Sequence, residues 1–298
     1  MIALPPREEI VADARRALAE DIGSGDLTAE LLPAGQNIRA SVITRASGIL
    51  CGQAWFNACF AQLDGATPTR VDWQAEEGAS VTAGQTLCEL EGEARVLLSG
   101  ERSALNFLQL LSGVASKTRQ YVDAIAGTRA QIVDTRKTLP GLRLAQKYAV
   151  RAGGGDNHRL ALWDAILIKE NHILAAGDIE AAIAAARQIA RKNPRCRFVQ
   201  IEVENLAEME AALAAGAKML LLDNFDLPLL RQAVRLNQGR AVLEASGGLT
   251  LADLRATAET GIDRISVGAL TKDIQAFDLS LRVSLRTAAR ACGGNIEN

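Results

Sequence analysis

The chain has 298 residues, of which 48% are hydrophobic and 4% aromatic, and its formal net charge is −2. This length favours two domains or one barrel with an appendage, and the nearly balanced charge argues against binding to nucleic acid or an anionic membrane. The prolines and charges of the first ten residues do not suit a secretory signal, and no apolar run approaches membrane-spanning length, so we expect a cytoplasmic protein.

The cysteines form an odd set without any Cys-x-x-Cys pair. They are Cys51, Cys59, Cys88, Cys196 and Cys292. This spacing argues against a disulfide framework and against a structural zinc site. We expect all five thiols to be reduced and most of them to be packing residues.

The first third of the chain has the pattern of a small α+β domain. Apolar residues at helical spacing predict a helix over 8–20, and short alternating runs broken by glycine predict strands between 38 and 90. Residues 77–87 resemble the hammerhead of biotinyl and lipoyl carriers, but no lysine stands at a hairpin tip to carry a prosthetic group. We therefore expect a structural sandwich, followed by a long helix over about 97–126.

Six apolar runs then alternate with alanine-rich helical segments. They cover residues 131–133, 165–168, 198–201, 219–222, 241–243 and 264–267. Fully apolar strands that alternate with helices indicate a parallel sheet covered on its outer face, and their number and spacing favour a closed α/β barrel. A Rossmann sheet is the weaker alternative, because no glycine-rich dinucleotide fingerprint follows the first strand.

Polar residues follow each of these predicted strands. The segments are 134–137, 169–172, 202–205, 223–224, 244–248 and Gly268. The carboxyl ends of barrel strands meet at one mouth, where barrel enzymes carry out their chemistry. Basic residues prevail over 134–172 and acidic residues over 199–226, which suits a ligand that is anionic at one place and metal-bound at another.

Glu202 and Asp223 end adjacent predicted strands, so their carboxylates can reach a shared divalent ion or a pair of sugar hydroxyls. Oxygen ligands favour Mg²⁺ or Mn²⁺ over zinc. The alternative is that both carboxylates form salt bridges with neighbouring basic groups.

Glycines end the last two predicted strands, in Ser246-Gly247-Gly248 and at Gly268. Glycine lets main-chain N–H groups approach an anion closely, and a helix expected to begin near Leu251 would point its positive end there. These loops predict a phosphate site, with two turns that hold no ligand as the alternative.

The two histidines of the chain, His158 and His172, both lie in the basic stretch. His158 ends a glycine run beside Arg159, and with Lys169 at a strand end it suits a carboxylate-binding cluster. A structural histidine is the alternative. His172 could cap or orient its loop, and its role stays open.

Several motifs resemble the quinolinate phosphoribosyltransferase family when taken together and in order. They are Glu101-Arg102-Ser103-Ala104-Leu105-Asn106, Asp134-Thr135-Arg136-Lys137-Thr138, residues 153–159, Leu167-Ile168-Lys169-Glu170-Asn171-His172, Glu202-Val203-Glu204, Leu222-Asp223-Asn224 and Ser246-Gly247-Gly248. The resemblance runs from Glu20 to Leu281, which is nearly the whole chain.

The resemblance implies a Mg²⁺-dependent reaction of quinolinate with phosphoribosyl pyrophosphate, giving nicotinate mononucleotide, carbon dioxide and pyrophosphate for NAD synthesis. It also implies a barrel of seven strands, of which the pattern yields six. The implied domains are an N-terminal sandwich over 1–115, completed by 276–298, and a barrel over 116–275. An obligate homodimer is implied as well, with Arg102 donated to the neighbouring subunit's site.

The family's functional positions fall on named residues of this chain. The resemblance assigns quinolinate binding to Arg102, Arg136, His158, Arg159 and Lys169, with Lys169 and Arg136 nearest the decarboxylation. It assigns pyrophosphate to Lys137, the ribose hydroxyls and Mg²⁺ to Glu202 and Asp223, and the 5′-phosphate to Ser246, Gly247, Gly248 and Gly268. Lys272 stands where many members carry histidine, and it would act as a phosphate partner. Lys137, Lys169, Glu202 and Asp223 form the implied catalytic set.

Three alternatives remain open at this stage. A related phosphoribosyltransferase, including relatives associated with molybdenum transport, could use the same fold for another acceptor. A Schiff-base aldolase could use Lys169 at its strand end, which borohydride trapping would test. A non-enzymatic carrier or interaction module is disfavoured by the missing carrier lysine and the polar strand ends.

Overall fold

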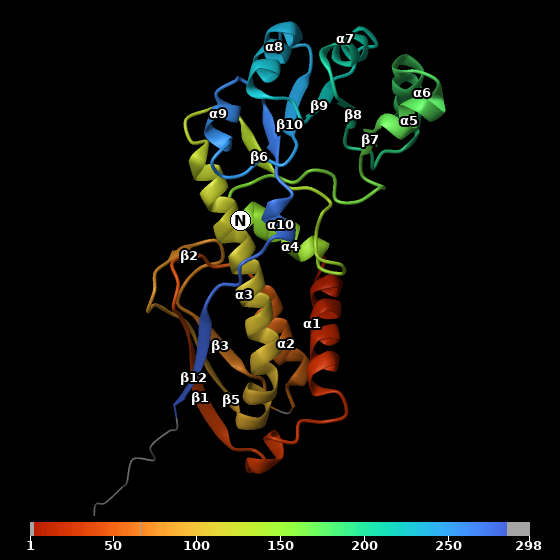
Figure 1. Ribbon diagram of the computed structural model, residues 1–298. Coiled ribbons are helices and arrows are strands. Elements are labelled where there is room, and N and C mark those ends of the chain that lie inside the picture. Colours follow the sequence, from red (N-terminus) through yellow and green to blue (C-terminus); the bar gives the residue numbers. More distant parts are fainter. Residues whose placement is uncertain (1–2, 66, 285–298) are drawn as a thin grey trace, which may run out of the picture.

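The computed structural model describes residues 3–65 and 67–284, which form two units that share one long helix (Figure 1). This helix, α3 (Ala94–Ala124), packs on α1 and α2 in the first unit and on β6 and α4 in the second. It runs straight through the boundary expected between residues 115 and 116, so a helix and not a flexible linker joins the units. Among the described residues, no helix is long and apolar enough to cross a membrane.

The N-terminal unit is a four-stranded antiparallel sheet with helices packed against it. The strand order is β12 (Leu279–Ser284), β1 (Asn37–Thr44), β5 (Thr86–Glu93) and β3 (Arg70–Trp73), and the helices are α1 (Arg7–Ile22), α2 (Gln53–Leu63) and α3. Smaller elements are the 3-10 helix η1 (Ala29–Leu31) and the paired strands β2 (Gly48–Ile49) and β4 (Ser80–Val81). Along β1, Ile38, Ala40 and Val42 are buried and alternate with more exposed residues, because successive side chains of a strand point to opposite faces.

The last described strand returns to this first sheet, although it follows the second unit in the chain. β12 pairs antiparallel with β1, in a register that runs from Arg39 opposite Ser284 to Thr44 opposite Leu279. Residues 285–298, which belong to the segment expected to return, lie outside the described residues together with Cys292. The other four cysteines are free thiols, and Cys51, Cys59 and Cys88 are buried, as a packing role requires.

The second unit contains a parallel sheet formed by the six predicted strands. Their order is β6 (Gln131–Val133), β11 (Arg264–Ser266), β10 (Val242–Ser246), β9 (Met219–Asp223), β8 (Val199–Val203) and β7 (Ile166–Ile168). The helices of this unit are α4 (Arg143–Ala152), α5 (Glu170–Ala176), α6 (Ile179–Lys192), α7 (Leu206–Ala214), α8 (Leu227–Asn237), α9 (Leu254–Ala258) and α10 (Ala269–Lys272). Within the described ranges, the edge strands β6 and β7 are not paired with each other, and beyond β6 only Asp156 forms an isolated parallel bridge, to Val133.

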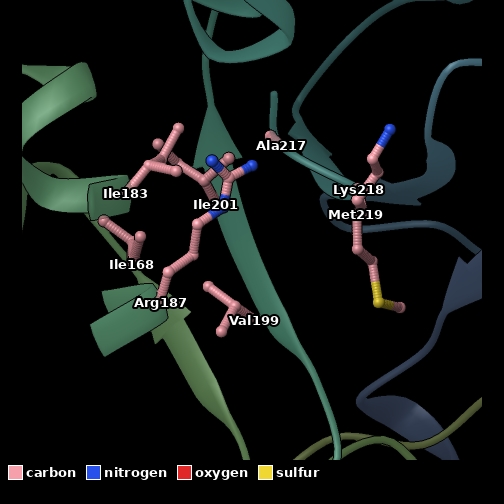
Figure 2. Close-up of a pocket in the computed structure, with 8 residues that line it drawn as sticks. All are labelled: Ile168, Ile183, Arg187, Val199, Ile201, Ala217, Lys218 and Met219. Carbon is pink, nitrogen blue, oxygen red and sulfur yellow. The ribbon is translucent and has the colours of Figure 1, made fainter. Parts of the chain in front are cut away.

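The outer face of this sheet is apolar and covered by helices. Figure 2 shows the space between α6 and strands β7 to β9, a cavity of about 230 Å³. Ile168, Val199 and Ile201 line it from β7 and β8, and residues 217–219 line it where β9 begins. Because strand side chains alternate, the residues between them point to the other face of the sheet, and in β8 these are polar. The sheet therefore separates an apolar outer layer from a polar inner one.

Candidate active site

A cavity of about 430 Å³ lies on the inner face of the sheet, at the carboxyl ends of its strands. Register explains which side chains line it: Glu202 stands opposite Leu221, and Leu221 opposite Glu244, so alternate residues of β8, β9 and β10 share one face. The lining residues are Thr135, Arg136, Lys137, His158, Arg159, Leu167, Lys169, Glu202, Leu221, Asp223, Glu244, Ser246 and Ser266. Eight of these had been predicted as site residues.

The remaining predicted site residues do not line this cavity within the described chain. Arg102 is exposed on α3, and Lys272 is exposed at the end of α10. Gly268 lies just behind the wall, because a Cβ placed on it would be 3.2 Å from Cδ of Lys137. The absence of a side chain at Gly268 therefore lets the main chain approach Lys137 closely.

The two glycines after β10 are required by the backbone of their loop. Gly247 has φ 114° and Gly248 has φ 50°, and a Cβ at Gly247 would lie 2.3 Å from Oδ1 of Asn224. The helix expected to begin near Leu251 is shorter and starts later than predicted, since α9 begins at Leu254 and a turn separates it from the glycines. A helix dipole directly at these glycines was therefore a wrong expectation.

A lysine and a carboxylate face each other across two neighbouring strands. Lys169 follows β7, and its Nζ lies 2.5 Å from Oε2 of Glu202 in β8. His172 fixes the main chain of this lysine, because its Nδ1 accepts a hydrogen bond from the Lys169 N–H at 3.1 Å and so caps α5. Capping is one of the two roles considered for His172 from the sequence, and this exposed histidine does not line the cavity.

Two arginines lie close together in the wall of the cavity. Arg159 is buried, and burial lowers the pKa of its guanidinium, which the neighbouring charge of Arg136 lowers further. Nε of Arg136 is buried and has no hydrogen-bond partner within the described residues. Two like charges in a poorly hydrated place repel each other, and an anion bound between them would relieve this cost. The wall is therefore suited to a multiply charged anion.

Asp134, the carboxylate that follows β6, has a structural role and does not line the cavity. Asp134 is fully buried and forms an ion pair with the buried Lys147. It also accepts hydrogen bonds from Nδ2 of Asn157 at 2.7 Å and from the His158 N–H at 2.9 Å. Burial raises the pKa of Asp134 to about 6 and lowers the pKa of Lys147, while their mutual attraction opposes both shifts. The pair holds the segment that delivers His158 to the cavity.

His158 is buried, and both of its ring nitrogens have partners inside the protein. Nδ1 accepts a hydrogen bond from the Arg159 N–H at 2.7 Å, and Nε2 lies 2.8 Å from Oε1 of Gln200. Burial lowers the pKa of His158 to about 4, although the bond to Gln200 opposes the shift. The imidazole is therefore neutral at physiological pH, and the cations in this wall are Arg136, Arg159 and Lys169.

Two polar groups in or beneath the cavity received no role from the sequence interpretation. Gln200 and Glu244 are fully buried beneath the cavity, on the same face of the sheet as Glu202. Glu244 follows the apolar run 241–243 and belongs to the polar strand-end segments, but no sequence pattern assigned it a role, whereas Gln200 lies inside the predicted strand 198–201. Counting back by two from Glu202 would have found Gln200, because alternate strand residues share a face.

Acid is expected to destabilise the protein through His158. In the unfolded chain the imidazole has its ordinary pKa of 6.5, whereas in the folded chain the pKa of His158 is about 4. Between these two pH values the imidazole is mostly protonated in the unfolded chain and mostly neutral in the folded one. The unfolded state then binds more protons, so the free energy of unfolding falls by ~1.4 kcal/mol per pH unit, and by about 3 kcal/mol over this window. Urea midpoints at neutral and acidic pH should show a smaller loss in His158→Gln than in the wild type.

The control for this measurement is His172→Gln, which removes the exposed histidine and leaves the buried one in place. Carboxylates titrate in the same window in all three proteins, so they cancel in the comparison. An identical acid loss in the wild type and in His158→Gln would contradict a neutral buried imidazole.

Both units match one known family. Residues 26–112 match the profile of the quinolinate phosphoribosyl transferase N-terminal domain, and residues 114–282 match that of its C-terminal domain. The chain is 41% identical to the probable nicotinate-nucleotide pyrophosphorylase (carboxylating) of Bacillus subtilis, over 89% of this chain and 90% of that one. It is 42% identical to the nicotinate-nucleotide pyrophosphorylase (carboxylating) of Mycobacterium leprae, over 90% and 94%.

A solved structure agrees with these sequence relationships. The nicotinate-nucleotide pyrophosphorylase from Francisella tularensis superimposes with a TM-score of 0.90 at 44% identity, covering 95% of this chain and 99% of that chain. Matches of this identity and coverage extend through both units and through the inner face of the sheet that forms the cavity. The chain therefore belongs to the quinolinate phosphoribosyl transferase family.

Proposed function

We propose that this cavity transfers the phosphoribosyl group of phosphoribosyl pyrophosphate to quinolinate and removes one carboxylate of the acceptor. The products are nicotinate mononucleotide, carbon dioxide and pyrophosphate, in the synthesis of NAD. The observation that carries the proposal is the opposition of charges in one cavity, with Arg136, Arg159 and Lys169 facing the carboxylates of Glu202 and Asp223. The names of the relatives describe the same reaction.

The basic wall forms the acceptor site in this proposal. Arg136, Arg159 and Lys169 bind the two carboxylates of quinolinate, and the unpaired Nε of Arg136 is available for one of them. The pyridine nitrogen then attacks the anomeric carbon as pyrophosphate leaves. No covalent nucleophile is needed, so the enzyme acts by positioning and by stabilising charge. The carboxylate at C2 then leaves as carbon dioxide, next to Lys169 and Arg136. The positive charge of the quaternary nitrogen stabilises the electron pair left at C2, and a proton from solvent completes the C2–H bond of the product.

The acidic wall forms the donor site. Glu202 and Asp223 lie on adjacent strands and on one face, because Asp223 is two residues beyond the cross-strand partner of Glu202. Their hard oxygen donors fit Mg²⁺, which these two residues would hold directly or through water. When bound there, the ion would neutralise charge on the pyrophosphate. In the described residues no cluster of three or more acidic, histidine or cysteine ligands exists, so substrate oxygens or water would complete the coordination.

The phosphates are assigned to the loops around this acidic wall. Lys137 would contact the pyrophosphate, and its chain lies against Gly268. Main-chain groups of Ser246, Gly247, Gly248 and Gly268 would hold the 5′-phosphate, and Lys272 would add a cation at its edge. This assignment uses glycine's freedom to expose N–H groups to an anion, without a helix dipole directly at the loop.

Closure of the sheet into a seven-stranded barrel is part of the proposal. The bridge between Asp156 and Val133 supports it, because it places a further segment beside β6 on the side away from β11. That segment would stand between β6 and β7 and supply the missing strand.

We also propose a homodimer in which Arg102 completes the neighbouring subunit's acceptor site. Arg102 is exposed on α3 and does not line the cavity of its own chain. Large apolar side chains are exposed near β7 and α5, with Leu162 71%, Trp163 59% and Leu174 69% accessible. Apolar surface of this kind favours burial against a partner.

One assay tests the reaction. The purified protein is mixed with quinolinate, phosphoribosyl pyrophosphate and Mg²⁺, and the release of carbon dioxide and pyrophosphate is followed. We expect both products in equal amounts, and neither when the donor is omitted. Carbon dioxide that fails to appear while pyrophosphate does would point to another acceptor chemistry.

Glu202→Gln and Asp223→Asn are expected to lower turnover about 100-fold while quinolinate alone still binds. The reason is that both carboxylates are assigned to the sugar and the metal, away from the acceptor's carboxylates. Turnover and calorimetric binding of quinolinate measure the two effects separately. Glu202→Gln also breaks the pair with Lys169, so its effect on quinolinate should exceed that of Asp223→Asn.

Glu204→Gln is the matched control, because Glu204 is exposed just beyond β8 and does not line the cavity. It should leave both measurements unchanged. Quinolinate binding abolished by Asp223→Asn would show that the division of the site into two halves is wrong.

Mixed mutant subunits test the shared site. In a heterodimer of Arg102→Ala with Lys137→Ala, an Arg102 that acts on the neighbouring site restores one intact site and leaves the other doubly defective. Random mixing should then recover roughly a quarter of the wild-type activity, since half the dimers carry one good site each. Activity after refolding of the mixed variants is the measurement.

The matched control mixes Arg136→Ala with Lys137→Ala. Both residues line the cavity of the same chain, so every site in that heterodimer stays defective and no activity should return. An Arg102→Ala mixture that stays as inactive as this control, despite proven subunit exchange, would rule out donation of Arg102.

A further inference from the structure

A row of buried polar side chains lies beneath the acceptor wall and has no role in the reaction described above. Gln200, Glu244 and Arg264 stand on β8, β10 and β11, on the inner face of the sheet. Gln200 and Glu244 are fully buried. In the described structure, both oxygens of Glu244, Nε2 of Gln200 and Nε of Arg264 have no hydrogen-bond partner. Buried polar groups are rarely left in this state without a function or a bound water.

The row contacts the acceptor wall through His158. Nε2 of His158 lies 2.8 Å from Oε1 of Gln200 and 3.5 Å from Oε1 of Glu244. The other ring nitrogen, Nδ1, accepts the main-chain N–H of Arg159 at 2.7 Å. The imidazole therefore connects the buried row to the backbone of an arginine that lines the cavity.

The contact with Arg159 determines which ring nitrogen carries the proton. A main-chain N–H can only donate, so Nδ1 must present its lone pair, and a proton on Nδ1 would point at another N–H. Nε2 is then the protonated nitrogen, and it donates to Gln200. This geometry requires the neutral Nε2–H tautomer, independently of the lowered pKa of the ring.

The carboxyl group of Glu244 fixes the direction of the Gln200 amide. With its oxygen facing the Nε2–H of His158, the amide turns its NH₂ group away and needs an acceptor for it. The neighbouring acceptor is Glu244, although neither of its oxygens reaches hydrogen-bond geometry with the amide in the described structure. Burial raises the pKa of the Glu244 carboxyl, and Arg264, the Gln200 side chain and Ser266 lower it in part. A flipped Gln200 amide would place its NH₂ group against the Nε2–H of His158, so that two donors would face each other. Only one orientation of the amide is therefore compatible with this ring.

We propose that Gln200 is a positioning residue of the acceptor site: supported by Glu244, it holds His158 as the neutral Nε2–H donor, so that Nδ1 anchors the main chain of Arg159. The neutral imidazole then positions the main chain of Arg159, and the positive charge that binds the acceptor comes from the arginines and Lys169. The inference that this wall binds an acceptor rests on the proposed function, whereas the tautomer does not.

The groups that surround the ring support a neutral imidazole. The charged groups that face it are Glu244 from β10, Arg264 from β11, Lys147 from α4 and Arg159 beside it. The Phe198 ring lies edge to face at 5.4 Å, and Asp134 accepts the His158 N–H. Three of these four charged groups are cations, so a second proton on the ring would be repelled.

Nitrogen NMR of the histidine rings tests the tautomer directly. The chain has only two histidines, so labelled histidine gives two sets of ring signals, which His172→Gln assigns. We expect His158 to show one protonated and one unprotonated nitrogen, with Nε2 protonated, unchanged between about pH 5 and 8. A doubly protonated ring, or a proton on Nδ1, at neutral pH would overturn the proposal whether or not quinolinate is the substrate.

Gln200→Met tests the consequence for the acceptor site, because methionine fills a similar volume without the amide. We expect mixed tautomers of His158 and a rise of about tenfold in the KM for quinolinate, with the KM for phosphoribosyl pyrophosphate unchanged. Gln146→Met removes another buried glutamine, which bonds to Leu139 and Thr271 instead, and should leave the His158 signals unchanged.

The results separate the two hypotheses. Unchanged tautomer and unchanged KM for quinolinate in a folded Gln200→Met protein would exclude a positioning role for Gln200. A wild-type protein that releases no carbon dioxide from quinolinate would instead refute the proposed function and leave the NMR result standing. If Gln200→Met does not fold, the wild-type ring signals still decide the tautomer.

Discussion

Nicotinate is expected to react with a specificity constant about 10⁴-fold below that of quinolinate. Nicotinate lacks one carboxylate, so it would leave part of a dense cationic wall without a partner. Arg136 and Arg159 are already close enough for the charge of one to lower the pKa of the other, and Nε of Arg136 has no partner in the described structure. Leaving such groups desolvated and unpaired is costly. Pyrophosphate release at a fixed donor concentration measures kcat/KM for both acceptors.

Arg136→Gln should reduce the preference for quinolinate over nicotinate, because it removes a cation that is expected to pair with the second carboxylate of quinolinate. We expect quinolinate to lose about 10- to 100-fold in kcat/KM and nicotinate to lose less. Arg70→Gln, at an exposed position on β3 in the other unit, is the matched control and should change neither value. Equal specificity constants for the two acceptors in the wild type would mean that the acceptor is not a dicarboxylate.

Replacing Lys147 by alanine is expected to lower the free energy of unfolding by about 3–5 kcal/mol. The lysine is 1% exposed and its partner Asp134 is fully buried, so the substitution leaves a carboxylate without its cation in a poorly hydrated place. Protonation of Asp134 would reduce this loss of stability, but it would weaken the hydrogen bonds that the carboxylate accepts from Asn157 and His158. Urea unfolding at a fixed protein concentration measures the change.

Two controls separate the buried pair from ordinary charge loss. Arg39→Ala removes a largely exposed cross-strand pair with Glu91 and should cost about 1 kcal/mol or less. The double variant Asp134→Asn with Lys147→Met removes both charges and keeps the volume, so it should be more stable than Lys147→Ala. A double variant that is no more stable than the single one would show that lost packing, and not an uncompensated charge, explains the effect.

The elements of the second unit could be predicted because the sequence pattern reports them directly. Each of the six apolar runs became a strand, with ends within a few residues of those predicted. Such strands are buried on both faces and read as continuous apolar segments, unlike half-buried ones. The polar residues after them also converged as expected, since Arg136, Lys169 and Asp223 line one cavity.

What the sequence by itself determined is the set of strands, the order of the motifs and the family to which they belong, because these depend on local periodicity and on residue identity. The tertiary structure alone decided which polar groups are buried and what they contact. Asp134 and Lys169 both follow apolar strands, yet one is fully buried in an ion pair and the other is half exposed beside Glu202. The protonation state of His158 likewise depends on a main-chain N–H and on Gln200, which is 42 residues away in the chain. Burial and hydrogen bonding of this kind arise from the packing of distant segments, and no local pattern encodes them.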